Sequence, residues 1–225
     1  MIFSKLNALT IPEGSVSRIV SNGVTLWEKS GLPSGCRQVK YLQSDGNQHI
    51  DTGIVGKSGI KSFIDFEYST GSMSDYIVFG CSYGNGSTSW NNRFYPASAR
   101  DGVWVLGYGD RLSAKVAPSF NKRYKVESEL SVGKQTMTVD GETVISGTLK
   151  TTINKNLTMY LFGVNYCGKA KYYGGCRIYS CWIESDGVLV RDFIPILDAN
   201  DKPCLYDKVS GEFFYNNGTG EFTYA

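Results

Sequence analysis

Short runs of alternating apolar and polar residues recur along this chain, and they predict β-strands rather than helices. In the run FIDFEY, Ile64, Phe66 and Tyr68 fall on one face of an extended strand. Asp65 and Glu67 fall on the other face, which we expect to be a solvated outer face. No segment sustains the 3.6-residue period of an amphipathic helix. The pattern therefore predicts a protein of about a dozen short strands.

The C-terminal segment Gly174–Tyr224 carries a strong hairpin signal. Two runs rich in β-branched and aromatic residues, Arg177–Glu184 and Val188–Pro195, flank the dipeptide Asp186-Gly187. Asp-Gly suits the tight turn of a two-residue β-hairpin. The segment continues as short predicted strands separated by turns, with no room for a helix of ~11 residues. Because an isolated hairpin is marginal in water, these strands must pair with strands from elsewhere in the chain.

Composition agrees with a β protein. The 225 residues include 15 tyrosines and 26 glycines, and aromatic residues make up 13% of the chain. Tyrosine, phenylalanine, threonine and valine favour half-buried pleated surfaces, and glycine favours tight turns. A chain of this length can bury a full core without disulfides. We therefore predict an all-β fold in which two antiparallel sheets pack as a sandwich.

The N-terminal residues form a second, smaller hairpin. Val16–Val20 and Val24–Trp27 flank Asn22-Gly23, and Asn-Gly favours the type I′ turn that matches the twist of paired strands. So short a segment cannot bury its own apolar side chains. It packs either on the main domain as an extra hairpin or on a partner protein as an attachment arm, and the sequence leaves both readings open.

The Gly- and Ser-containing linker Ser30–Gly35 follows this hairpin. We accordingly assign residues 1–30 to an N-terminal β-hairpin attachment module and residues 31–225 to the main domain. The candidate attachment residues are the apolar side chains of the hairpin: Val16, Ile19, Leu26 and Trp27.

Charge and hydropathy exclude several classes of function. The net charge is +2 and the basic residues are dispersed, so we expect no nucleic-acid partner. No apolar stretch approaches the ~18 residues that would suggest a membrane span. Met1–Thr10 lacks a charged region followed by an apolar one, as in a secretory signal. We expect a protein that stays in a cytosol, or leaves it by assembly or lysis.

The six cysteines are expected to be reduced thiols. Cys176 and Cys181 lie five residues apart on one predicted strand, which places them on opposite faces and too far apart to bridge. No pair has the CxxC spacing of a zinc site. Most of these cysteines are therefore expected to act as small core residues.

The sequence offers little catalytic chemistry. Glycoside hydrolysis needs two carboxylates that flank the bond, and the pair Glu127/Glu129, like Asp65/Glu67, resembles a solvated outer face. His49 is the sole histidine and is expected to be a partly buried polar aromatic residue rather than a base. A calcium site built from loop carbonyls and Asp51, Asp101 or Asp110 is an open alternative, although no EF-hand spacing supports it. We expect no enzyme and, apart from this calcium alternative, no metal or cofactor.

Sugar recognition uses aromatic faces, with amides and charged groups for the hydroxyls. Two long polar loops, Ser82–Asn92 and Asn165–Gly175, and one aromatic strand supply those residue types. The alternative is that the strand aromatics belong to the core and the loop residues are ordinary surface. The candidate glycan-binding residues are Tyr83, Asn85, Trp90, Asn91, Trp104, Tyr108, Tyr172 and Tyr173.

The run Tyr41–Ile54 (YLQSDGNQHIDTGI) resembles the opening of a concanavalin A-like, laminin-G-like jelly-roll domain, which is widespread in phages and in surface proteins of gut bacteria. Its closing residues are similar to the runs VRDFIP (190–195), LYD (205–207), GEFF (211–214) and GTG (218–220). The resemblance covers about Leu32 to Tyr224 and implies two packed antiparallel sheets, one of them usually concave. At His49 the family more often carries tyrosine.

The fold implies less about function, because it hosts lectins, hydrolases and packing modules. The N-terminal hairpin is also similar to a module at the front of phage structural proteins. We therefore expect a non-enzymatic bacteriophage virion surface protein, on the capsid or the tail, whose jelly roll binds glycans for adhesion to the host. The alternative is a purely structural decoration protein without a ligand. A glycoside hydrolase is disfavoured because the three-carboxylate motif of hydrolase relatives is absent, and a bacterial adhesin because no export or wall-sorting signal is present.

The expected partners are other virion proteins, bound through the N-terminal module, and bacterial surface polysaccharide. Further copies of the chain are a third candidate. The expected location is the virion surface, after assembly in the cytoplasm of the host bacterium.

Overall fold

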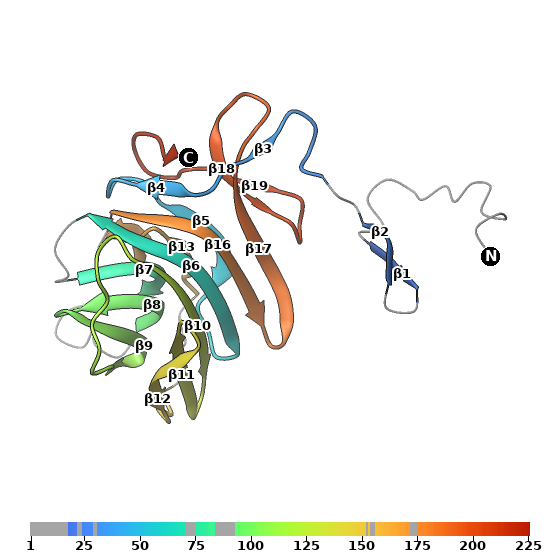
Figure 1. Ribbon diagram of the computed structural model, residues 1–225. Helices are drawn as coiled ribbons and strands as arrows, with labels where there is room; N and C mark the ends of the chain where they lie inside the picture. Colours follow the sequence, from blue (N-terminus) through green and yellow to red (C-terminus); the bar gives the residue numbers. More distant parts are fainter. Residues whose placement is uncertain are drawn as a thin grey trace. The chain divides into compact units, whose positions relative to one another are not determined.

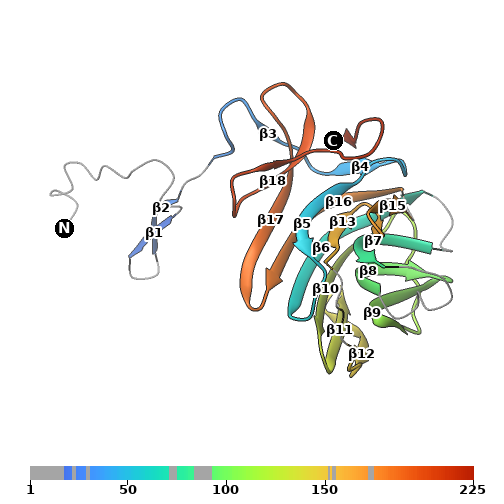
Figure 2. The ribbon, with the colours of Figure 1, turned by 180° about the vertical axis from the view of Figure 1, so that it is seen from behind.

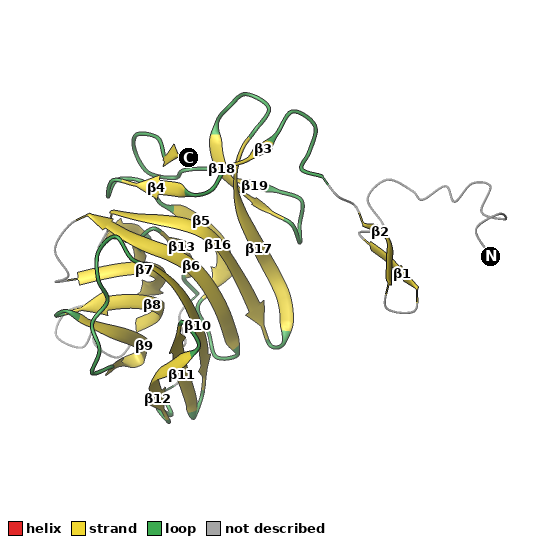
Figure 3. Ribbon diagram, viewed as in Figure 1, coloured by secondary structure: helices red, strands yellow, loops and turns green. Residues whose placement is uncertain are grey.

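The computed structural model describes residues 18–21, 24–28, 31–70, 75–83, 93–151, 153, 156–171 and 175–225. The chain divides into two compact units, Met1–Gly35 and Cys36–Ala225. The division falls at the end of the linker Ser30–Gly35, whereas the sequence places it at the start of that linker. Figure 3 shows strands and loops in the described residues and no helix. Accordingly, these residues contain no helix long and apolar enough to cross a membrane.

The N-terminal unit contains the predicted hairpin. Strands β1 (Arg18–Ser21) and β2 (Val24–Glu28) pair antiparallel, with Ile19 opposite Trp27. Val16 lies outside the described residues, as do the side chains of the other three attachment candidates. The attachment role of this unit therefore stays a prediction.

The second unit is a two-sheet sandwich, seen from opposite sides in Figures 1 and 2. Within the described residues the larger sheet has eleven strands. Across it follow β12 (Glu142–Gly147), β11 (Lys134–Val139), β10 (Arg123–Ser131), β6 (Ile60–Thr70), β16 (Gly175–Ser185), β17 (Val188–Leu197), β18 (Pro203–Asp207) and β19 (Phe213–Phe214), with β3 (Arg37–Gln38) beside β17, β4 (Leu42–Ser44) beside β16 and β20 (Thr223–Tyr224) beside β4.

The smaller sheet has seven strands in the same described part of the chain. Its order is β15 (Lys169–Lys171), β14 (Val164–Tyr166), β7 (Asp75–Ser82), β13 (Thr158–Leu161) and β5 (Ile50–Val55), with β8 (Arg93–Arg100) beside β7 and β9 (Val103–Ser113) beside β8. Strand β14 runs parallel to β7, and the other pairs in both sheets are antiparallel. The predicted all-β, antiparallel sandwich is confirmed, apart from this one short parallel pair.

The predicted C-terminal hairpin is formed by β16 and β17. Its two turn residues, Asp186 and Gly187, both have positive φ angles, 52° and 80°. A type I′ turn requires this combination, and it matches the twist of the flanking strands. Lys57 donates to the Asp186 carboxylate at 2.6 Å and ties the turn to the loop before β6.

The core lies between the sheets and is rich in aromatic rings. On β6, Ile64, Phe66 and Tyr68 are buried, as their alternation predicts. The ring of Phe66 meets those of Tyr68 and Trp104 edge to face, with centroids 5.0 and 6.1 Å apart. Such pairs contribute about 0.5–1.5 kcal/mol beyond their buried area.

The expectation of a solvated outer face on β6 is wrong. Asp65 and Glu67 point away from the core, yet they are only 4% and 8% exposed. Arg123 on β10 donates Nε and Nη2 to the two Asp65 carboxylate oxygens at 2.6 and 2.8 Å. Arg177 and the Tyr179 hydroxyl on β16 donate to Glu67 at 2.7 and 3.0 Å. Flanking strands thus cover both carboxylates with cations and an aromatic ring.

The expectation that Cys176 and Cys181 face opposite sides is also wrong. A β-bulge between Ile178 and Ser180 adds one residue to β16, so both thiols point into the core. Cys176 lies opposite Tyr68 and Cys181 opposite Ile64, four positions apart on β6. That separation is about 13 Å, still too long for a disulfide.

Burial raises the pKa of both these thiols well above its ordinary value. It also raises the pKa of Cys81 and of Cys204 to about 12. These four thiols stay protonated at neutral pH, which makes them unreactive core residues.

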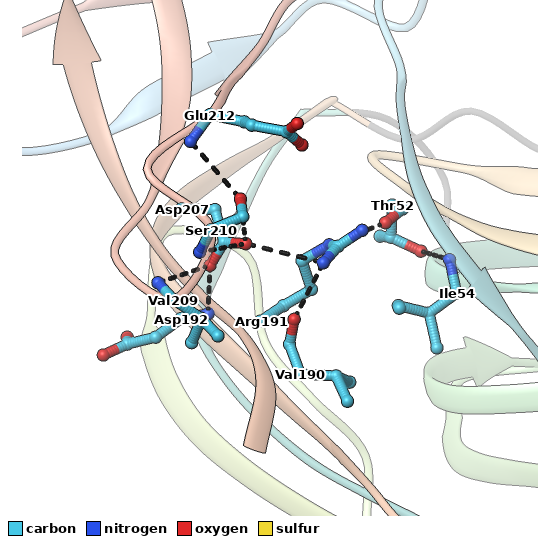
Figure 4. A network of polar contacts seen from close by, with 9 residues as sticks. All are labelled: Thr52, Ile54, Val190, Arg191, Asp192, Asp207, Val209, Ser210 and Glu212. Carbon is cyan, nitrogen blue, oxygen red and sulfur yellow. Dashed lines mark hydrogen bonds and ion pairs between the residues drawn. The ribbon is translucent and has the colours of Figure 1, made fainter. Parts of the chain in front are cut away.

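Figure 4 shows the polar network that joins the sheets near the C-terminus. Asp207 on β18 is fully buried and accepts from the backbone N–H groups of Asp192 and Val209 at 2.7 and 3.1 Å. Arg191 on β17 forms an ion pair with Asp207 at 3.6 Å. Its Nε also donates to the carbonyl oxygen of Thr52 on β5, at 3.0 Å. One arginine thereby links the larger sheet to the smaller one.

Candidate functional site

The structure removes two residues from the predicted glycan site. Trp104 and Tyr108 on β9 are 2% and 0% exposed, and both belong to the core cluster. The Trp104 ring packs edge to face against Tyr124, with centroids 5.0 Å apart. No sugar can reach these faces, so their assignment to a glycan surface is wrong and the core alternative holds.

The structure does not test the role of the other six candidates in glycan binding. Tyr83 follows β7 and is half-buried. Asn85, Trp90, Asn91, Tyr172 and Tyr173 lie outside the described residues.

The described residues contain an open pocket of about 520 Å³, within the usual range for small-molecule sites. It lies at one end of the smaller sheet, where β5 and β13 meet the β14–β15 hairpin and the loop before β20. We call it the His49–Tyr160 pocket. It is lined by Asn47, His49, Asp51, Tyr160, Gly168, Ala170, Asn217, Gly218 and Thr219.

Hydrogen bonds between two distant loops build one wall. The backbone N–H of His49 donates to Asn216 Oδ1 at 3.1 Å, and the N–H of Asp51 donates to Asn217 Oδ1 at 2.9 Å. In return, the N–H of Asn217 donates to the carbonyl oxygen of His49 at 2.8 Å. The opening and closing runs of the sequence resemblance therefore meet at this pocket.

Gly218 allows these two loops to approach each other closely. A Cβ at this position would overlap the carbonyl oxygen of Asn47 and would lie 3.1 Å from His49 Nδ1. Only glycine fits here without displacing backbone. The GTG run thus has a direct steric explanation.

An aromatic pair forms the floor of the pocket. The rings of His49 and Tyr160 stack with centroids 4.8 Å apart and an interplanar angle of 24°. Met159 and Leu161 are fully buried, so Tyr160 between them projects from the opposite face of β13, away from the core. Burial lowers the pKa of His49, an effect that the nearby Asp51 carboxylate partly opposes. His49 is therefore a neutral, buried aromatic residue at neutral pH, as expected, but it also lines the pocket.

Asp51 supplies the carboxylate of the pocket. Its Oδ1 accepts from the backbone N–H of Gly53 and its Oδ2 from the Thr158 hydroxyl, both at 2.9 Å. These two bonds hold the carboxylate on the outward face of β5. Within the described part of the chain, no lysine or arginine lines the pocket.

The facing wall is made of small residues. Gly168 and Ala170 belong to the β14–β15 hairpin, where the N–H of Gly168 donates to Asn165 Oδ1 at 2.8 Å. Asn165 also donates to the carbonyl oxygen of Thr158 at 2.9 Å, which fixes the hairpin against β13. Gly168 and Ala170 therefore add little side-chain bulk to this wall of the pocket.

The described lining combines an aromatic ring, a carboxylate and neutral hydrogen-bonding groups. Asn217 uses Oδ1 to hold Asp51, which leaves its Nδ2 as a donor at the rim, beside the exposed Thr219. No group of three or more histidine, cysteine, aspartate or glutamate side chains is placed to hold a metal ion among the described residues. The sequence reasoning missed this site, although five of its nine lining residues lie in the runs that carry the resemblance: Asn47, His49, Asp51, Gly218 and Thr219.

Comparison with solved structures identifies the class of fold. The carbohydrate-binding module CBM40 of the Ruminococcus gnavus IT-sialidase, bound to α2,3-sialyllactose, is 11% identical, with a TM-score of 0.50 over 65% of this chain and 90% of that chain. A candidate carbohydrate-binding protein from Bacteroides ovatus is 13% identical, with a TM-score of 0.56 over 84% of this chain and 60% of that one. Mouse laminin α1 domains LG4-5 are 16% identical, with a TM-score of 0.47 over 71% and 44%.

No model of a protein family matches this sequence. No curated protein matches it either. The likeness to solved structures therefore concerns the fold: the second unit is a concanavalin A-like, laminin-G-like jelly roll. The fold predicted from the opening and closing runs is confirmed.

Proposed function

We propose that this protein is a non-catalytic carbohydrate-binding protein that holds a sugar in the His49–Tyr160 pocket. The observation that carries the proposal is the lining of this pocket. An aromatic ring, a carboxylate, two side-chain amides and a hydroxyl surround one open cavity of about 520 Å³. The fold class, which includes carbohydrate-binding modules, gives further support.

Each group in this lining has a counterpart on a sugar. The Tyr160 ring lines the pocket, and an aromatic ring of this kind can pack against the C–H groups of a pyranose. The Asp51 carboxylate and the amides of Asn47 and Asn217 can exchange hydrogen bonds with ring hydroxyls. The backbone bonds between the two loops hold these groups in place before a ligand arrives, which reduces the entropic cost of binding.

The same lining argues against catalysis. Glycoside hydrolysis requires a pair of carboxyl groups about 5–9 Å apart. Asp51 is the one carboxylate that lines the pocket among the described residues, and it already accepts two hydrogen bonds. The Asp65 and Glu67 carboxylates are bound to arginines on the outer face of the larger sheet.

A glycan array that carries bacterial polysaccharides and defined oligosaccharides tests the proposal. Tyr160→Ala removes the stacking face but keeps the backbone pairing of Tyr160 with Asp51 and Gly80. We expect binding to fall at least tenfold while the melting temperature changes little. Asn200→Ala, on an exposed loop outside the pocket, is the matched control and should bind as the wild type does. Full binding by a folded Tyr160→Ala variant, or no glycan bound by the wild type, would refute the proposal.

We further propose that the protein is displayed on a phage virion, where sugar binding would serve adhesion to the host. This part rests on the sequence resemblances of the jelly roll and of the N-terminal hairpin. The competing role is capsid or tail decoration without a ligand. Sugar binding that depends on Tyr160 would favour adhesion over decoration.

A further inference from the structure

The electrostatic character of the His49–Tyr160 pocket restricts the sugars that it can hold. Among the described lining residues, the titratable groups besides Tyr160 are His49, which is neutral at neutral pH, and the Asp51 carboxylate. The other described lining groups are amides, a hydroxyl and small residues. The formal charge of this described lining is therefore negative.

The two lysines of β15 do not line this pocket. Lys169 and Lys171 flank Ala170 on β15, and side chains alternate along a strand. With Ala170 lining the pocket, the two lysines belong to the opposite face of β15, and Lys171 lies over the Tyr166 ring at 4.5 Å.

We infer that this pocket selects neutral sugars, hexoses or N-acetylhexosamines, and rejects sugars that carry a carboxylate, such as uronic and sialic acids. The inference rests on the proposed sugar-binding function and adds the ligand class. Recognition of an acidic sugar requires a cation or a set of converging N–H donors for its carboxylate. Here such a ligand would instead bring a second negative charge next to Asp51, and no lysine or arginine among the described residues lines the pocket to pair with it.

The inference separates this chain from a structure with the same fold. The Ruminococcus gnavus module named above is described as bound to sialyllactose, a sugar that carries a carboxylate. At 11% identity the shared fold carries no information about the ligand. The charge of the pocket lining favours a different class of sugar in this protein.

Matched sugars provide the test. The full chain is titrated by calorimetry with the methyl glycosides of glucose, galactose, N-acetylglucosamine and N-acetylgalactosamine. Glucuronic, galacturonic and N-acetylneuraminic acids are titrated in parallel at the same ionic strength. We expect at least one neutral sugar to bind at least tenfold more tightly than the acids, a factor that corresponds to about 1.4 kcal/mol.

A second variant isolates the charge. Asp51→Asn keeps an oxygen and an N–H for the bonds to Gly53 and Thr158 but removes the negative charge. We expect the difference in affinity between a neutral sugar and its uronic acid to become smaller in this variant. The affinity for the neutral sugar should change less than the affinity for the acid. Lys171→Ala, which removes a charge from the opposite face of β15, should leave the difference in affinity unchanged.

The outcomes separate this inference from the proposed function. An acidic sugar that binds as tightly as its neutral counterpart would overturn the selectivity and leave sugar binding intact. A difference in affinity that persists in full in Asp51→Asn would overturn the role of the charge. No binding of any sugar in either set would overturn the proposed function, and this inference with it.

Discussion

Replacing Arg123 with methionine should destabilise the jelly roll by about 2–4 kcal/mol at pH 7, because it leaves a buried carboxylate without its cation. The Arg123 guanidinium binds both oxygens of Asp65, at 2.6 and 2.8 Å. The two partners differ in exposure: the Asp65 side chain is 6% exposed and that of Arg123 is 47% exposed. Methionine retains an unbranched apolar stem, so the change removes mainly the charge.

Because the two side chains differ in exposure, we expect substitution of Arg123 and substitution of Asp65 to lower the free energy of unfolding by different amounts. Removing one member of a fully buried ion pair typically costs ~3–5 kcal/mol, and we lower this range because solvent reaches Arg123. Asp65→Asn should cost only about 1 kcal/mol, because the half-exposed Arg123 is rehydrated and keeps its contact with Tyr179. That contact places the guanidinium carbon 3.7 Å from the centre of the Tyr179 ring.

Urea denaturation followed by tryptophan fluorescence measures both changes. Lys125→Met is the matched control, since it removes a positive charge from an exposed position on the same strand. We expect it to change the free energy of unfolding by less than about 0.5 kcal/mol.

Equal costs for Arg123→Met and Asp65→Asn would contradict this reasoning, because the argument depends on the unequal exposure of the pair. A cost for Arg123→Met no larger than that of Lys125→Met would show that Asp65 is hydrated. In that case the outer face of β6 would be the solvated surface that its sequence pattern suggests.

Three further predictions concern the core, the pocket and the N-terminal unit. Trp104→Ala should lower the free energy of unfolding by about 3–5 kcal/mol, measured by denaturant titration, without changing sugar binding by the folded fraction. The lowered pKa of His49 means that its neutral form stabilises the fold above the unfolded pKa of ~6.5, and that this contribution is lost as the pH falls below it. Melting temperatures between about pH 8 and pH 5 should therefore fall more steeply for the wild type than for His49→Gln. Deleting residues 1–30 should leave the melting temperature of the jelly roll unchanged and abolish incorporation into virions; truncated protein on purified particles would contradict the attachment role.

The strands of this protein were predictable because their signals are local. Asp186-Gly187 adopts the positive φ angles that a type I′ turn requires, and the turn alone sets the hairpin. The alternation of Ile64, Phe66 and Tyr68 assigns the inner face of β6 in the same way, from neighbouring residues. The N-terminal hairpin around Asn22-Gly23 follows the same rule.

The outer face of β6 was not predictable, because its partners come from distant strands. Alternation shows that Asp65 and Glu67 leave the core, but it does not show what covers them. Their cations, Arg123 and Arg177, lie 58 and 110 residues away and arrive only through the pairing of β10 and β16 with β6. The same limit applies to Cys181. Its side chain faces the core because of a bulge between Ile178 and Ser180, and no turn signal in the sequence marks that bulge.

The pocket was missed for a related reason, and the way it is built decides how it should be tested. Asn216 and Asn217 belong to a turn-like run near the C-terminus, and each accepts a backbone N–H from residues 49–51, more than 160 positions away. These side chains hold the C-terminal loop in place and also line or support the pocket. Substituting them would mix a loss of fold with a loss of ligand. Tyr160 enters the pocket from β13, where its backbone pairing survives substitution. Removing its ring ends the stacking on His49 but leaves the hydrogen bonds between the two loops in place. A binding defect in Tyr160→Ala therefore reports on the ligand, whereas the same defect in an asparagine variant would not.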